Sequence, residues 1–286
     1  MNKPVNIKIN TDKLIPHKEK IKFIYDFIPR SENTSESTIT VKNSMFMNTD
    51  NTLGQTVIPE LFSQVYAAHL EYFDKLNRGP ESLGFLVGIK DLIFNDSIYK
   101  GDTLIIKVKE ENEIQAFQIV SGTVYKNKEE IANCNFKIWI PEKDADVIKE
   151  PKREVKPEKL FNSPAVKSLC NNPLKQEILK SICNLKQDRE TAEAVLYFEK
   201  DFTGFSGHFT DFPVLPGAVI LETGKFLTEI ILMRQIKILR IDNVKFSNII
   251  MPEQVIIFKM LLAQKRISIK VFSKNTACSN ILMEVL

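Results

Sequence analysis

The strongest constraint on how this chain folds is an internal repeat in its sequence. IKDLIFNDSIYKGDTLIIKV begins at Ile89, and IDNVKFSNIIMPEQVIIFKM begins at Ile241. Aligned without gaps, the two segments place Phe94 opposite Phe246. In each copy, runs of β-branched residues flank a short turn, which predicts a strand, a turn and a second strand. The chain is therefore expected to contain two copies of one structural unit.

A helical pattern precedes each strand block. In VIPELFSQVYAAHLEYFDKL, Pro59 lies near the start, where proline is tolerated, and one stripe holds Leu61, Val65, Ala68 and Tyr72. GAVILETGKFLTEIILMRQ is apolar on nearly every side, which is typical of a helix buried on most faces. Each half thus predicts a short strand, a buried helix and an antiparallel meander, an α+β arrangement.

This layout resembles the hot-dog fold, in which an antiparallel sheet wraps one central helix. The segment 141–160 is charged, contains prolines and is poor in apolar residues, as an exposed linker is. We expect a double (tandem) hot-dog, with an N-terminal unit at 1–142, a linker with an extra helix at 143–180, and a C-terminal unit at 181–286.

Composition excludes several classes of protein. The net charge of +3 comes without a Lys/Arg block interleaved with aromatic residues, so nucleic acid is not an expected partner. The first residues lack the apolar core of a signal peptide, and no run nears the ~20 apolar residues that span a bilayer. Four cysteines without C-x-x-C spacing indicate reduced thiols in a cytoplasmic protein.

The second half carries a spaced motif in FSGHFTDFPVLPGAVILE. His208-Phe209 is followed by Pro213, by Pro216-Gly217 and by Glu222. These residues and their spacing resemble the signature of the hot-dog β-hydroxyacyl-ACP dehydratases.

The first half resembles the same superfamily without its histidine. LIPHKEKIKFIYDFI (14–28) is similar to the dehydratases' opening Pro-His segment, and Glu60 with Gln64 is similar to their helical E-x-x-x-Q. Fourteen residues before Glu60 stands Phe46, and the Pro-Gly pair is missing. Together the halves resemble the paired dehydratase subunits of aryl-polyene pigment pathways, here fused into one chain.

In such dehydratases the histidine of one unit faces the carboxylate of the other unit's helix. The resemblance therefore implies that His208 faces Glu60, with Gln64 one helical turn along on the same face. Glu222 would face the Phe46 region, where no base exists. One site between the halves is then complete and the other is inactive.

The chemistry of dehydration suits these residue types. A base must remove the α-proton of a 3-hydroxyacyl thioester, and an acid must protonate the departing hydroxide. His208 is the expected base, and a buried Glu60, kept protonated by desolvation, is the expected acid. The backbone N–H at Gly217 would bind the thioester oxygen, and Gln64 and Val214 are the other expected substrate-binding or oxyanion residues.

Simpler roles exist for several of these groups. The helix dipole alone would favour a glutamate such as Glu60 in the first turn of a helix. His208 could be an ordinary structural histidine. His17 is expected to pack in the leading turn and His69 to be structural. Histidines at three distant positions predict no metal-ligand cluster, and no glycine-rich dinucleotide motif follows a strand, so no metal or cofactor is expected.

The leading functional prediction is a 3-hydroxyacyl-ACP dehydratase, a lyase that forms trans-2-enoyl-ACP in fatty-acid or polyene-type biosynthesis. Acyl carrier protein is the implied partner, with coenzyme A as the open alternative. A hot-dog thioesterase and a non-catalytic acyl-binding or scaffold subunit are the competing functions. Both a monomer and a homodimer remain open.

Overall fold

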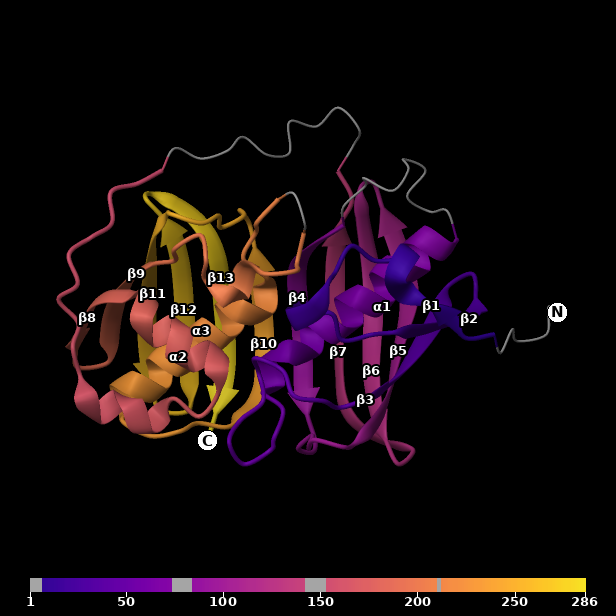
Figure 1. Cartoon of the computed structure of the whole chain (residues 1–286), viewed down its shortest axis with the longest axis horizontal. Coiled ribbons are helices and arrows are strands. Elements are labelled where there is room, and N and C mark those ends of the chain that lie inside the picture. The colour runs from indigo at the N-terminus through magenta and orange to yellow at the C-terminus, as the bar shows by residue number, and fades with distance from the viewer. Residues whose placement is uncertain (1–6, 74–83, 142–152, 210–211) are drawn as a thin grey trace.

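The computed structural model describes residues 7–73, 84–141, 153–209 and 212–286. Two similar lobes lie side by side in it, and each places its long helix on the same side of a shared sheet (Figure 1). The long helices are α1 (Ile58–Tyr72) and α3 (Gly217–Leu232), and a shorter helix, α2 (Pro173–Ser181), lies beside α3. The described residues also form 3-10 turns at Thr11–Lys13, Glu19–Ile21, Gln55–Val57, Pro164–Leu169 and Thr203–Phe205.

Thirteen strands form one antiparallel sheet in the described parts of the chain. The first lobe supplies β1 (Ile9–Asn10), β2 (Asp26–Ser31), β3 (Thr34–Thr40), β4 (Phe85–Phe94), β5 (Thr103–Ile114), β6 (Phe117–Lys126) and β7 (Glu129–Trp139). The second lobe supplies β8 (Ile182–Asp188), β9 (Thr191–Tyr197), β10 (Ile238–Phe246), β11 (Val255–Ala263), β12 (Arg266–Ser273) and β13 (Thr276–Val285). Their spatial order is β1-β2-β3-β5-β6-β7-β4-β10-β13-β12-β11-β9-β8.

The double hot-dog expected from the repeat is confirmed. β4 and β10 end at the aligned residues Phe94 and Phe246, and β5 and β11 begin at the equivalent positions Thr103 and Val255. β4 and β10 also pair with each other, with Val244 opposite Ile89, and this pairing joins the two sheets into one.

Side-chain alternation explains why one sheet face is covered by helices. Along β5, Leu104, Ile106 and Val108 are buried while Ile105 between them is 40% exposed. This period of two places every second side chain under α1. Three members of the predicted α1 stripe are fully buried, but Tyr72 is 41% exposed, because the helix ends there and its last turn leaves the core.

Candidate active site

Glu60 stands in the first turn of α1, after Pro59 at the helix start. Its side chain is buried, and its Oε1 accepts a hydrogen bond of 2.9 Å from Nε2 of Gln64. Gln64 also donates to the carbonyl of Ile21 at 2.7 Å and accepts from the N–H of Phe23 at 2.9 Å. Gln64 therefore fixes Glu60 and ties the N-terminal segment to α1.

His208 is half-buried in the loop that leads into α3. Its Nδ1 lies 3.2 Å from the carbonyl oxygen of Val214. Because a carbonyl only accepts, Nδ1 must carry the proton, and Nε2 is left as a bare lone pair. The loop thus presents His208 in the tautomer that a general base needs.

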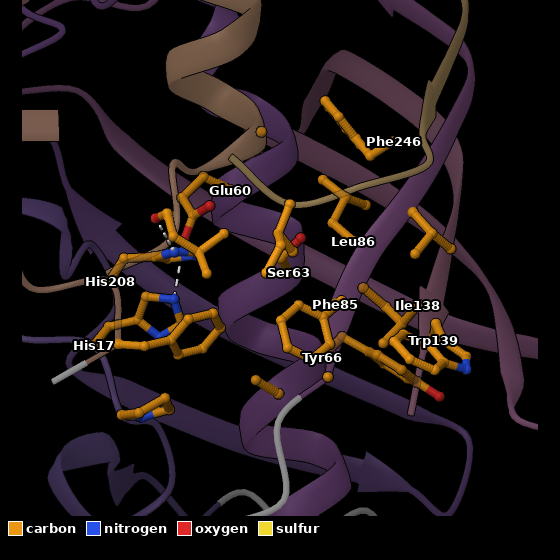
Figure 2. Close-up of a pocket in the computed structure, with 18 of the residues that line it drawn as sticks. His17, Glu60, Ser63, Tyr66, Phe85, Leu86, Ile138, Trp139, His208 and Phe246 are labelled. Atoms are coloured by element: carbon orange, nitrogen blue, oxygen red, sulfur yellow. Dashed lines mark hydrogen bonds and ion pairs between the residues drawn. The ribbon is translucent and has the colours of Figure 1, made fainter. Parts of the chain in front are cut away.

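The structure brings His208 and Glu60 together and adds His17. Nε2 of His17 lies 3.1 Å from Oε1 of Glu60, and both side chains are buried. The rings of His17 and His208 meet edge to face with centroids 5.4 Å apart. Figure 2 shows the three side chains converging from the N-terminal segment, from α1 and from the loop before α3. The expectation that His17 only packs in the leading turn is wrong, because it contacts Glu60. Its position in the Pro-His segment was the sequence feature that could have indicated this contact.

The tautomer of His17 follows from its surroundings. Nδ1 of His17 is buried and has no hydrogen-bond partner among the described residues. An N–H there would lack an acceptor at a cost of about 1–3 kcal/mol. The hydrogen bond to Glu60 therefore uses a proton on Nε2 of His17.

A backbone contact holds the two histidine segments together. The N–H of Lys18, the residue after His17, donates to the carbonyl of Gly207, the residue before His208, at 2.9 Å. This bond links the N-terminal half of the chain to the C-terminal half. Gly207 has a φ of +80°, and a Cβ there would lie 2.1 Å from the Lys18 carbonyl oxygen. Glycine is required at this position for both reasons.

Electrostatics set the charge state of the pair. Burial would raise the pKa of Glu60, but the hydrogen bond and charge of His17, with His208 and Gln64, lower the pKa to about 2. Burial lowers the pKa of His208 to about 4, against the opposing effect of Glu60. The expectation that burial keeps Glu60 protonated is therefore wrong, because its hydrogen-bond donors outweigh desolvation. The site holds a carboxylate beside a neutral imidazole.

The three groups border a cavity of about 430 Å³. Figure 2 shows the polar groups at one side of it and Phe85, Ile138 and Trp139 at the other, where the lining is apolar. Gly217, the first residue of α3, also lines this cavity, next to Phe246. The first N–H groups of a helix have no partner within the helix, so α3 offers a donor there.

The other two expected substrate-binding residues have supporting positions. Val214 borders the cavity, and its carbonyl orients His208. Gln64 is fully buried behind Glu60 and is not among the described residues that line the cavity.

Glu222 lies in a different environment, away from His208. Its oxygens accept hydrogen bonds from Thr56 at 2.6 Å and from Asn172 at 3.1 Å. Its Oε2 is 3.9 Å from the Cβ position of Gly54, whose N–H bonds to the carbonyl of Phe46. Glu222 thus faces the Phe46 region, as the resemblance implied, and polar side chains satisfy it there.

His69 is fully buried on α1, where Nδ1 shares a hydrogen bond of 2.8 Å with Ser35. Its ring stacks on Tyr66, whose hydroxyl donates to Glu110 at 2.8 Å. Burial raises the pKa of Tyr66, and the neighbouring Glu110 carboxylate raises it further, so the phenol stays protonated. These contacts describe a structural histidine behind the cavity wall.

One group of described residues has the spacing of metal ligands. Single donor atoms of His17, Glu60 and His208 all lie within 4.8 Å of one another. The sequence predicted no such cluster, because positions 17, 60 and 208 meet only in the folded chain.

All four cysteines are unpaired, and no helix in the described parts of the chain is long and apolar enough to cross a membrane.

The two halves of the chain match two different family models. Residues 9–149 match the family model of the ApeP-like dehydratases, and residues 184–281 match that of the ApeI-like dehydratases. A search of curated proteins gave no match.

Among solved structures, an acyl-ACP thioesterase from Bacteroides thetaiotaomicron superposes with a TM-score of 0.60 at 11% identity, covering 90% of this chain and 100% of the other. A pyran synthase domain of the sorangicin pathway gives 0.56 at 10% identity, covering 92% and 97%. The ApeI:P dehydratase heterocomplex from Xenorhabdus doucetiae is 20% identical over 47% of this chain and 93% of its own, with a TM-score of 0.44. The first two likenesses show the hot-dog fold.

Proposed function

Because the chain belongs to the ApeP-like and ApeI-like hot-dog dehydratases, joined in that order, we propose that it dehydrates 3-hydroxyacyl thioesters at one site between its halves. The substrate is carried by acyl carrier protein in the cytoplasm, and the product is the trans-2-enoyl thioester of a fatty-acid or polyene-type pathway. The observation that carries this proposal is the meeting of His208 and Glu60 at the polar side of an otherwise apolar cavity.

The charge states suggest how the protons balance. Nε2 of His208 removes the α-proton, while the N–H at the start of α3, beside Gly217, stabilises the enolate oxygen. The new imidazolium lies next to the Glu60 carboxylate, which relays the same proton to the β-hydroxyl as it leaves as water. One proton is taken and one is returned, so the pair is reset after each turnover.

His17 and Gln64 act on Glu60 rather than on the substrate. Their hydrogen bonds of 3.1 Å and 2.9 Å fix both the position and the charge of the carboxylate. A carboxylate held in this way can accept and pass on a proton without turning away from His208.

Thioester hydrolysis is the competing reaction. It needs a carboxylate that activates water, and Glu60, with a pKa of about 2, is a weak base for this task. The stronger base is His208, whose Nδ1–H is held by the Val214 carbonyl, which leaves Nε2 as its basic nitrogen.

One assay separates the candidate functions. A 3-hydroxyacyl-ACP is incubated with the protein, and enoyl formation and thiol release are followed together. Dehydration predicts enoyl product without free thiol, thioester hydrolysis predicts the reverse, and a scaffold subunit predicts neither.

A further inference from the structure

We propose that His17, Glu60 and His208 form a zinc-binding site, and that zinc bound there reversibly inhibits the protein. The inhibitory part of this inference rests on the proposed dehydratase function, whereas the binding part does not. Zinc would be a regulator at this site, because the proposed dehydration needs no metal.

The donor set is one that zinc prefers. Two imidazole nitrogens and one carboxylate oxygen, with a fourth position left for water, are a recurrent set of zinc ligands. Magnesium and calcium, by contrast, select sites made of oxygen atoms. The three side chains come from separate segments of the chain, and the hydrogen bond from Lys18 to Gly207 holds the two histidine segments together.

The geometry fits a small ion after a modest closure. Zinc ligands at ~2.0–2.2 Å from a tetrahedral ion lie roughly 3.3–3.6 Å from one another. His17 Nε2 and Glu60 Oε1 are already 3.1 Å apart, and all three donors lie within 4.8 Å. His208 sits in a loop, so a shift of its ring toward Glu60 would complete the set.

The position of the proton on the His208 ring suits this residue to bind a metal ion. Its Nδ1–H donates to the Val214 carbonyl, which is the outer contact that zinc-bound histidines usually make, and its Nε2 is bare. Among the described residues that line the cavity, the charged side chains are Lys13, Glu60 and Glu71, which gives an excess of one negative charge. A divalent cation more than offsets this single negative charge.

His17 explains why binding would be reversible. Zinc at Nε2 moves the proton of the ring to Nδ1, which has no acceptor among the described residues. A zinc-bound histidine without an outer acceptor is a weaker ligand. Zinc on Nε2 of His208 also occupies the lone pair that the proposed reaction uses, so a molecule that holds zinc cannot remove the α-proton.

The binding test uses the chelator-treated full chain and Co²⁺, whose visible absorption reports four-coordinate binding. We expect a saturable band at a single equivalent that Zn²⁺ displaces. His17→Gln and His208→Gln should each weaken binding by more than the ~10–100-fold that loss of an outer-shell partner costs. Cys170→Ser, which removes a half-buried thiol, is the matched control and should bind as the unaltered chain does. Absence of saturable binding, or unchanged affinity in His17→Gln, overturns the site.

The inhibition test measures turnover of a 3-hydroxyacyl-ACP as zinc is added to the same protein. Activity should be full after chelation and should fall in proportion to zinc occupancy. Full activity at full occupancy overturns the inhibition. A chelated protein that binds zinc as predicted but never dehydrates the substrate refutes the proposed function and leaves the zinc site supported.

Discussion

His208 stands in a loop and is only half-buried, so its removal should cost the core little. We predict that His208→Ala lowers kcat for dehydration by roughly 10²- to 10⁴-fold, which is typical for the loss of a general base. Thermal unfolding measured in parallel should show an unchanged fold. Turnover close to that of the unaltered chain would place the base elsewhere.

Gly207 offers a second residue-scale test, because its neighbour Lys18 lies against it. Gly207→Ala should displace the His208 loop and lower both stability and kcat, since the new Cβ would lie 2.1 Å from a backbone oxygen. Gly101→Ala is the matched control, with a φ of +92° and open space around it. That control should lose only the ~1–2 kcal/mol of left-handed backbone strain and keep its turnover. Equal effects of the two changes on kcat would refute the importance of the Lys18 contact.

At the residue scale, the family resemblance implied that His208 and Glu60 face each other, and the structure brings them together. Sequence reasoning could not assign their charges. The pKa of Glu60 depends on His17, which is forty-three positions away and meets it only after folding. Burial alone predicted a protonated acid, and the hydrogen bonds that reverse this prediction are tertiary contacts.

At the scale of elements, α2 is fastened to α3 by buried charges. Lys175 on α2 forms a 2.6 Å ion pair with Glu229 on α3, and Lys225 also bonds to Glu229 at 2.6 Å. Glu222, one turn before Lys225, is held by Asn172 next to α2 and by Thr56 from the other half. Polar contacts thus fill the place where a second site would stand.

This network predicts a pH-dependent stability. Burial would raise the pKa of Glu222, but the charges of Lys225 and Lys175 and the bonds from Thr56 and Asn172 lower it. A lowered folded-state pKa contributes stability above the unfolded value of ~4.3, and this stability is lost as pH falls through the lower folded value.

We predict that Glu222→Gln costs about 1–3 kcal/mol of unfolding free energy at pH 7. The difference from the unaltered chain should shrink below about pH 4, as measured by denaturant titration at each pH. Glu177→Gln, which removes a more exposed glutamate on α2, should change stability by less than about 0.5 kcal/mol at every pH. A constant penalty for Glu222→Gln across this range would contradict the lowered pKa.

The ends of β4 and β10 were predictable because the repeat aligns residue for residue up to Phe94 and Phe246. Helical periodicity likewise predicted α1 and α3. The ion pair of Lys175 could not be predicted, because a lysine in a polar helix normally faces solvent.

At the scale of the whole molecule, the pairing of β4 with β10 joins two units that are alike in fold and unlike in chemistry. Sequence reasoning expected a tandem hot-dog, but the edge at which the two sheets join depends on strand order, which no local pattern encodes. We predict that a non-hydrolysable 3-hydroxyacyl thioether analogue binds at a single equivalent per chain, as measured by calorimetry. Two equivalents of equal affinity would mean that the Glu222 side also binds substrate.

The most direct test of a site shared between the halves compares two glutamates. Dehydration of a 3-hydroxyacyl-ACP is measured per folded molecule for Glu60→Gln, Glu222→Gln, His208→Ala and the double variant Glu60→Gln/His208→Ala. Glutamine keeps the size of each side chain and removes its charge, so packing loss cannot explain a difference. We predict that Glu60→Gln is about as damaging as His208→Ala, that the double variant is hardly worse than either, and that Glu222→Gln keeps most of the turnover. Inactivity of Glu222→Gln together with activity of Glu60→Gln would contradict the shared site.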